Sequence, residues 1–189
     1  MPRIVLSYLQ AEDLLKARAT GKDSATVSPD LGLTAAEVTV EPAGARFRDG
    51  QFLAWEDLET ISASPRSCFV LEDEVLQKIQ IFSKTANRLY SLMPTPGAPT
   101  MLISGIPMHR IKGTDPYRDT LQKIKTIAPV TGRVLDTATG LGYTAIEAAK
   151  TADHVVTIEL DPVALGIARL NPWSQGLFEA PNITQLVGD

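Results

Sequence analysis

The segment Arg133-Val-Leu-Asp136-Thr-Ala-Thr-Gly140-Leu-Gly142-Tyr143 decides the fold of the C-terminal part of this chain. Its first four residues are typical of a short buried strand, and a turn with two glycines follows. Glycine lets the backbone approach a ligand closely, and the helix expected over 143–150 begins with unpaired N–H groups. The segment therefore predicts a strand, a ligand-binding turn and a helix in succession.

The same alternation of strand and helix continues on both sides of this segment. Apolar residues predict strands over 154–160 and 183–187, and the helix between them begins at Asp161-Pro162 and ends at Asn171-Pro172. Upstream, Asp115-Pro116 predicts the start of a helix that Pro129 stops. This order is typical of an α/β protein and predicts the first half of a doubly wound, Rossmann-like parallel sheet with right-handed crossovers.

Residues 1–106 have a different pattern, which predicts a separate small β-rich (α+β) domain ahead of a second domain over 107–189. Asp49-Gly50 suits a tight hairpin turn between strands at 45–48 and 51–54. The other expected elements are a helix over 11–19 and strands over 37–40, 68–71, 78–82, 88–93 and 101–103.

Composition excludes several classes of protein. The 189 residues are 44% apolar and 21% charged with a net charge of −4, which is typical of an ordinary globular protein and not of a disordered or fibrous one. No apolar run is long enough for a bilayer helix, and the start of the chain lacks a secretory pattern, so we expect a cytoplasmic protein. Cys68 is the only cysteine, which excludes an internal disulfide and a thiolate metal cluster, and no metal site is predicted.

Positive charge is concentrated in residues 107–133. This segment holds six basic and two acidic residues, a local charge of +4 within an acidic protein. The basic residues are Arg110, Lys112, Arg118, Lys123, Lys125 and Arg133. A solvated helix face is the simpler explanation, and a surface for RNA or an anionic substrate is the alternative.

Acidic residues follow each of the three expected parallel strands. Asp136 ends the first strand, Glu159 lies at the end of the second and Asp189 just past the third. Glu159 comes 19 residues after Gly140, a spacing at which an acidic side chain meets ribose hydroxyls in nucleotide sites. Together with the glycine turn, these acids predict a site for a nucleotide-type ligand at the carboxyl edge of the sheet.

At these residues the chain resembles the class I, Rossmann-like S-adenosylmethionine-dependent methyltransferases. Asp136, Ala138, Gly140 and Gly142 match the first motif of that family, with alanine where the first glycine usually stands. The chain more closely resembles a group of predicted methyltransferases that carry a small β-rich N-terminal domain. That closer resemblance rests on Met108-His109-Arg110, Lys112-Gly-Thr-Asp-Pro116, Asp119-Thr120, the glycine turn and Asn171-Pro-Trp-Ser174.

The resemblance implies S-adenosylmethionine as cofactor and assigns roles to residues. Asp136 and the turn would hold its methionine part, Glu159 would accept hydrogen bonds from the ribose hydroxyls, Leu160 would pack on the adenine and Asp189 would receive the adenine amino group. The full set of expected cofactor residues is Asp136, Thr137, Ala138, Thr139, Gly140, Gly142, Tyr143, Glu159, Leu160 and Asp189. His109 and Arg110 are weaker candidates for substrate contact, and no catalytic residue is assigned.

Two other functions remain open. Gly140, Gly142 and Ala145 also fit a dinucleotide fingerprint, so an NAD-binding Rossmann protein is an alternative. Asp136 argues against it, because a carboxylate suits the amino group of a cationic cofactor and would repel an anionic pyrophosphate. A non-catalytic binding module that acts through a partner is the second alternative.

The family sheet has seven strands, whereas residues 132–189 have room for three. We therefore expect a C-terminally truncated methyltransferase domain, in which the strand at 133–136 has one unpaired edge. The N-terminal domain, self-association or pairing with a missing C-terminal half would cover that edge. The methyl acceptor, a small molecule or an RNA, is not identified by the sequence, and Asn171-Pro172-Trp173 is interpreted as the end of a helix and not as a substrate motif.

Overall fold

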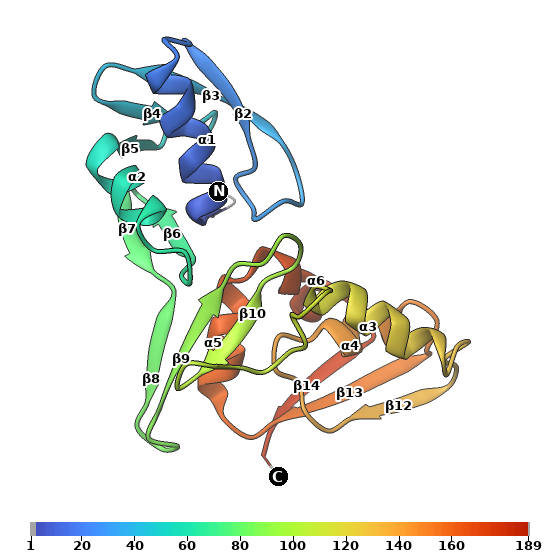
Figure 1. The fold of residues 1–189 in the computed structure, drawn as a ribbon. Helices are drawn as coiled ribbons and strands as arrows, with labels where there is room; N and C mark the ends of the chain where they lie inside the picture. Colours follow the sequence, from blue (N-terminus) through green and yellow to red (C-terminus); the bar gives the residue numbers. More distant parts are fainter. Residues whose placement is uncertain (1–2, 189) are drawn as a thin grey trace. The chain divides into compact units, whose positions relative to one another are not determined.

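The computed structural model describes residues 3–188 and divides the chain into two compact units (Figure 1). The first unit ends at Ile79 and the second begins at Gln80, whereas the sequence pattern predicts a boundary between residues 106 and 107. The difference arises because the strands of residues 80–107 pair with one another and pack against a helix of the second unit.

The first unit contains two antiparallel sheets and two helices. Its elements are β1 (Ile4–Leu6), α1 (Tyr8–Ala19), β2 (Ser24–Val27), β3 (Ala36–Glu41), β4 (Gly44–Arg46), β5 (Phe52–Ala54), α2 (Trp55–Ser62), β6 (Phe69–Glu72) and β7 (Val75–Lys78). The strand orders are β1-β6-β7 and β2-β3-β4-β5. Helix α1 begins with a capping box at Ser7. The Ser7 hydroxyl accepts a hydrogen bond from the backbone of the first turn, and the Gln10 side chain accepts one from the Ser7 N–H.

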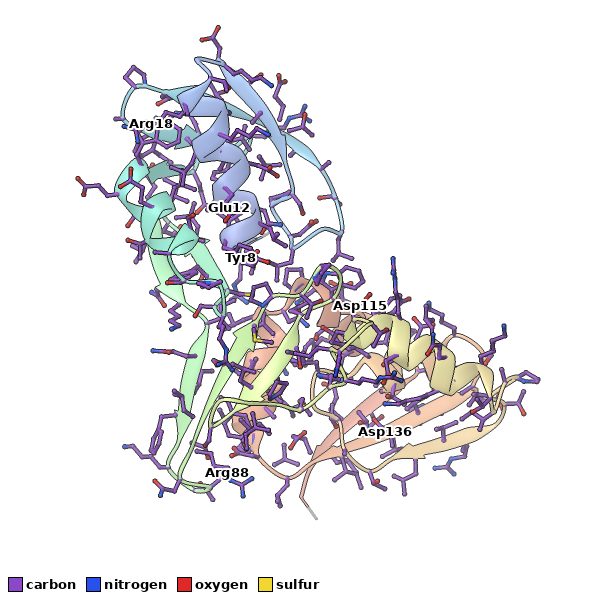
Figure 2. All side chains as sticks on the ribbon, viewed as in Figure 1. Tyr8, Glu12, Arg18, Arg88, Asp115 and Asp136 are labelled. Atoms are coloured by element: carbon purple, nitrogen blue, oxygen red, sulfur yellow. The ribbon has the colours of Figure 1, made fainter. Side chains whose placement is uncertain are left out.

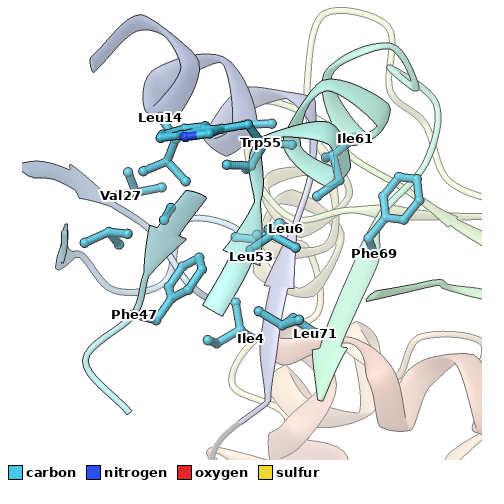
Figure 3. Close-up of a cluster of buried hydrophobic side chains, with 14 residues drawn as sticks. Ile4, Leu6, Leu14, Val27, Phe47, Leu53, Trp55, Ile61, Phe69 and Leu71 are labelled. Atoms are coloured by element: carbon cyan, nitrogen blue, oxygen red, sulfur yellow. The ribbon is translucent and has the colours of Figure 1, made fainter. Parts of the chain in front are cut away.

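The core of the first unit is made by apolar side chains from both helices and both sheets (Figure 3). Leu6, Leu14, Leu53 and Leu58 are fully buried, and Trp55 is 6% exposed. Removal of this apolar area from water is the main force that holds the two sheets and the helices together. The first unit therefore has its own core, as the prediction of a small α+β domain requires.

Several predictions for this part are confirmed and others are wrong. The hairpin around Asp49-Gly50 is confirmed, because β4 and β5 pair across it and Gly50 has a φ of 92°. The single strand expected over 78–82 is wrong, since the unit boundary falls inside it. Helix α2 was not predicted from the sequence.

The second unit begins with a four-stranded antiparallel sheet of order β11-β10-β9-β8. Its strands are β8 (Gln80–Ser83), β9 (Arg88–Met93), β10 (Thr100–Ile103) and β11 (Ile106–Pro107). Helix α5 (Pro162–Leu170) packs against β8 and β9, and Gly166 permits this approach because a Cβ there would lie 3.2 Å from Ile81 Cδ1.

The remainder of the second unit contains the predicted parallel sheet, of order β12-β13-β14. Its elements are α3 (Pro116–Lys125), β12 (Arg133–Asp136), α4 (Tyr143–Ala149), β13 (His154–Glu159), α5, the 3-10 helix η1 (Pro172–Ser174), α6 (Gln175–Glu179) and β14 (Ile183–Val187). Asp115 and Asp161 cap α3 and α5 as the Asp-Pro pairs predict. Between α3 and β14, the elements that the sequence does not predict are η1 and α6.

Both edges and one face of the parallel sheet are open among the described residues. Strands β12 and β14 each pair with β13 and with no other described strand. Helices α3 and α4 lie on the same side of the sheet (Figure 1), whereas Leu135 and Leu186 on the other face are 61% and 47% exposed. The expected unpaired edge of the first strand is therefore present in this structure.

Over residues 3–188, no helix is both long and apolar enough to cross a bilayer.

Candidate functional site

Asp136 lies at the carboxyl end of β12, where the glycine turn begins (Figure 2). Its Oδ2 accepts a hydrogen bond of 2.8 Å from the Thr157 hydroxyl on the neighbouring strand, and the backbone N–H of Ala138 also bonds the carboxylate. Because Thr157 is directly opposite Asp136 in the parallel register, the sheet itself fixes the orientation of this side chain.

The charge of Asp136 is disfavoured in this position. Burial raises the pKa of its carboxyl group above the ordinary value, and the negative charge of Glu159 raises it further. The hydrogen bonds from Thr157 and Ala138 lower that pKa and offset part of the effect. A positively charged ligand beside Asp136 would therefore favour the ionised carboxylate, to which no lysine or arginine among residues 3–188 forms an ion pair.

Glu159, at the carboxyl end of β13, is bound to the glycine turn. Its Oε2 accepts a hydrogen bond of 2.8 Å from the Gly140 N–H, and its Oε1 accepts one of 3.2 Å from the Asp161 N–H. A carboxylate oxygen has two lone pairs, so each oxygen of Glu159 retains acceptor capacity for a ligand hydroxyl. The side chain is thus held in place by main-chain donors while it remains able to bind.

Thr139 connects the turn to the neighbouring strand. Its N–H donates to the Ile158 carbonyl at 3.0 Å, and its hydroxyl lies 2.6 Å from the Thr157 hydroxyl. Thr139 is 5% exposed, and its side chain stabilises the turn by contact with β13. The preceding Thr137 and Ala138 are exposed. Of the three, Thr137 and Ala138 are the ones that a ligand can reach in this structure.

The two glycines of the turn are required by their backbone and their surroundings. Gly140 has a φ of 52°, and a Cβ there would lie 2.6 Å from Met108 Cε. Gly142 has a φ of 77°, and a Cβ there would lie 2.8 Å from a methyl group of Leu177 on α6. Side chains at either position would be strained and crowded, which explains the glycines structurally.

A buried polar network that the sequence analysis did not predict supports the turn from the other side. Asn171 is fully buried and its side-chain amide donates to the Tyr143 hydroxyl at 2.9 Å and to the Ser174 hydroxyl at 2.7 Å. Ser174 in turn donates to the Leu141 carbonyl at 2.7 Å, and Tyr143 donates to the Pro99 carbonyl at 2.9 Å. The Tyr143 hydroxyl thus both donates and accepts hydrogen bonds within the protein.

Asn171 also caps the helical turn η1 through a hydrogen bond from the Trp173 N–H, and its backbone is the C-cap of α5. The Asn-Pro pair was the available sequence signal, and its interpretation as the end of a helix is confirmed. Its additional contact with the glycine turn could not be inferred from spacing.

His109 is held by its neighbours. Its Nδ1 lies 2.9 Å from the Thr100 hydroxyl, and its ring centroid is 5.5 Å from that of Tyr143. Burial, together with the positive charge of Lys123, lowers the pKa of His109 to about 4, so the imidazole is neutral at pH 7. Arg110 has a largely exposed side chain that approaches Asp119 at 3.9 Å.

Part of the basic segment is neutralised by its own acids. Asp119 is 6% exposed and bonds Lys123 at 2.6 Å, and Asp115 forms an ion pair of 3.3 Å with Arg118. No ion pair is found for Lys112 or Lys125 among residues 3–188. The segment therefore retains positive charge at the surface after these pairs are formed.

The remaining predicted site residues fall on and beyond the end of β13. Leu160 directly follows Glu159 and is 71% exposed, so its side chain is accessible to a flat apolar group. Asp189 lies outside the described residues. The structure thus brings Asp136, Glu159 and Leu160 to the same carboxyl edge as the glycine turn.

The charge of this edge restricts the chemistry of a ligand. Among residues 3–188, no lysine or arginine forms an ion pair with Asp136 or Glu159. Two carboxylates next to an exposed leucine favour a ligand that combines positive charge, hydroxyl groups and an apolar surface. They disfavour an anion, because like charges in a partly buried site repel one another.

Comparison with known proteins gives one sequence relative and several similar structures. No family model matches the chain. The chain is 40% identical over 146 residues to an uncharacterised protein of Methanocaldococcus jannaschii, a match that covers 77% of this chain and 49% of that protein. The chain thus spans about half the length of the curated relative it matches.

Similar solved structures cover part of the chain at low identity. Spermidine synthase from Thermotoga maritima has a TM-score of 0.49 and 17% identity, over 61% of this chain and 43% of that one. The tRNA m1G37 methyltransferase of M. jannaschii has a TM-score of 0.35 and 18% identity, over 55% of this chain and 31% of that one. These values assign no activity to the chain, and its site residues must be judged by their own geometry.

Proposed function

We propose that this chain carries the cofactor site of a class I, Rossmann-like S-adenosylmethionine-dependent methyltransferase. The observation that supports this most strongly is that Asp136 and Glu159 end adjacent parallel strands, Asp136 at the start of the glycine turn and Glu159 hydrogen-bonded to the Gly140 N–H of that turn. Ligands of open α/β sheets bind at this edge. S-adenosylmethionine has the two positive charges, the ribose hydroxyls and the apolar ring that such an edge favours.

Each residue would have a distinct part in binding. Asp136 would accept hydrogen bonds from the α-ammonium group, because its carboxylate is the buried and poorly compensated one. Glu159 would accept from the ribose hydroxyls with the lone pairs that Gly140 and Asp161 leave free. Leu160 would pack against the adenine through its exposed side chain.

When bound, this cofactor supplies a methyl group on a sulfonium sulfur, a centre that already has a good leaving group. The chain then needs mainly to bind and orient the reactants. The hydrogen bonds of Thr157, Thr139 and Gly140 serve that purpose, since they fix both carboxylates before any ligand enters. His109 has its Nδ1 engaged with Thr100, which favours a structural role for it over that of a general base.

A dinucleotide cofactor such as NAD is the weaker candidate. Its pyrophosphate would lie against a turn that is flanked by Asp136 and Glu159, and the repulsion would be strong in a partly buried site. The second alternative, a binding module without turnover, uses the same cofactor residues and differs only in the absence of methyl transfer.

The proposed acceptor is a small molecule or an RNA. The positive charge that remains on residues 107–133 supports an anionic acceptor. If the acceptor is an RNA, its retention by the chain should fall steeply with salt concentration, because each neutralised phosphate releases counterions.

Transfer of radiolabelled methyl groups tests this proposal. The chain is incubated with S-adenosylmethionine labelled on the methyl group and with separate pools of RNA and of small-molecule extract. We expect incorporation into one pool by the wild type and none by Asp136→Ala. Cofactor binding without incorporation into any pool would favour the binding module, and absence of binding would refute the proposal.

A further inference from the structure

Met108 lies directly against the glycine turn although it comes from a different part of the unit. It follows β11, and its Cε and Sδ would lie 2.6 and 3.4 Å from a Cβ at position 140. Gly140 is buried in this structure, whereas the Met108 side chain is 40% exposed. One side of the Met108 side chain thus covers Gly140, and the other side is exposed to solvent.

The main chain at Met108 is fixed, and only its side chain can adjust. Its N–H donates to the Met101 carbonyl at 3.0 Å. The next residue, His109, is anchored to the Thr100 hydroxyl and to the ring of Tyr143, at the start of α4. Methionine has three rotatable bonds and a polarisable thioether, so its tip can follow the shape of a neighbour while its backbone stays in place.

Met108 borders the turn that lies between the two carboxylates in the chain. Asp136 stands at the start of the turn, and the Gly140 N–H bonds Glu159. A ligand that contacts both carboxylates lies along this turn, and Met108 lies beside Gly140 within it. An uncharged side chain at this point can touch a cationic ligand without repelling it, whereas a lysine or arginine would repel it.

We propose that Met108 is a ligand-contacting wall of this site and helps to determine which ligands fit over Gly140. The inference rests on the proposed function, since it needs a ligand that spans Asp136 and Glu159. It adds a contact from the antiparallel sheet to a site otherwise built from the parallel sheet.

Methyl NMR of the whole chain tests this contact. Methionine labelled with ¹³C at the methyl group gives one signal per residue, and Met108→Leu assigns the signal of interest. S-adenosylhomocysteine is then titrated into the wild type. We expect a shift of the Met108 signal, while Met93 and Met101, which are 8% and 1% exposed in the core, serve as internal controls and stay nearly unchanged.

Affinity measurements on two variants provide an independent test. Met108→Leu keeps the apolar volume and should bind S-adenosylhomocysteine within about twofold of the wild type. Met108→Ala removes the contact and should bind about three- to tenfold more weakly, as expected for the loss of a few buried methyl or methylene groups. Because the side chain is partly exposed, both variants should fold.

The outcomes separate this inference from the proposed function. Binding of S-adenosylhomocysteine with no shift at Met108 and no loss in Met108→Ala would overturn the inference and leave the proposed function standing. Failure of the wild type to bind would overturn both.

Discussion

The Gly140 N–H donates a hydrogen bond of 2.8 Å to Glu159 Oε2, which ties the turn after β12 to the end of β13. This bond joins the glycine turn to the acid 19 residues later, the two features from whose spacing the sequence predicts one shared site. It places the acceptor atoms of Glu159 beside the turn before a ligand arrives. A preorganised acceptor loses less entropy on binding than a free side chain.

Replacement of Asp136 by asparagine should abolish ligand binding without lowering the unfolding temperature of the chain. The pKa of Asp136 is raised by burial, so its ionisation is less favourable in the folded chain than in the unfolded one. Its contribution to stability is therefore greatest at low pH and is lost as the pH rises through the folded-state pKa. At pH 7, Asp136→Asn should unfold at the same temperature as the wild type or a few degrees above it, while S-adenosylhomocysteine binding falls below detection. Thermal unfolding and calorimetry measure the two effects, and a strongly destabilised variant would contradict this account of Asp136.

Ligand affinity should depend on pH through the same group. The ammonium group of the ligand binds the ionised carboxylate, so affinity should fall as the pH is lowered through the raised pKa of Asp136. Titrations of the wild type with S-adenosylhomocysteine between pH 8 and pH 5 would measure this, on protein whose circular dichroism confirms that it stays folded. An affinity that rises on acidification would rule out Asp136 as the partner of a cation.

Gly140→Ala should destabilise the chain about as much as Gly113→Ala. Both glycines have positive φ, 52° and 73°, so both substitutions carry a similar backbone cost of about 1 kcal/mol. At position 140 the new Cβ would meet the methyl end of Met108, which can turn aside because this side chain is flexible and partly exposed, and at position 113 no atom lies within 4 Å of a Cβ. Urea unfolding of the two variants measures both costs. A clearly greater loss of stability in Gly140→Ala that Met108→Ala recovers would show that Met108 is held rigidly against the turn.

The Asn171 network should contribute both to stability and to the shape of the turn. Asn171→Ala leaves the buried hydroxyls of Tyr143 and Ser174 without their donor, a loss of about 1–3 kcal/mol in the free energy of unfolding. The control is Thr126→Ala, which removes an exposed hydrogen bond at the end of α3 and should cost less than about 0.5 kcal/mol. Urea unfolding measures both, and similar losses in the two variants would argue against a special role for the network.

The open edge of β12 should promote association. We expect further polypeptide, either a second copy or a separate half, to cover this edge and the exposed Leu135. Sedimentation of the purified chain should then show concentration-dependent self-association that Leu135→Lys weakens. Leu89→Lys, at a leucine that is 42% exposed on β9, is the matched control and should have little effect. A monomer at all concentrations would show that a second copy does not cover the edge.

The sequence predicted the parallel part of the fold well because its signals are local. The Asp-Pro pairs before α3 and α5, and the apolar runs of β12, β13 and β14, each determine an element from neighbouring residues. The assignment of Asp136 and Glu159 to one edge follows from the same pattern, since parallel strands place their carboxyl ends together.

Contacts between distant residues were beyond the reach of the sequence. Nothing in the spacing of Met108 indicates that its methyl group lies on Gly140, because that contact depends on how the antiparallel sheet approaches the turn. Similarly, the strand expected over 78–82 is continuous as a hydrophobic pattern, and its division at residues 79 and 80 depends on which unit each half packs against.

Calorimetric titration of the 189-residue chain with S-adenosylmethionine, S-adenosylhomocysteine and NAD tests the central claim most directly. We predict that the first two bind with one site per chain, that Asp136→Asn abolishes both, and that NAD does not bind. Binding of NAD, or binding of S-adenosylhomocysteine that is unchanged in Asp136→Asn, would contradict the assignment of this carboxyl edge to a cationic cofactor.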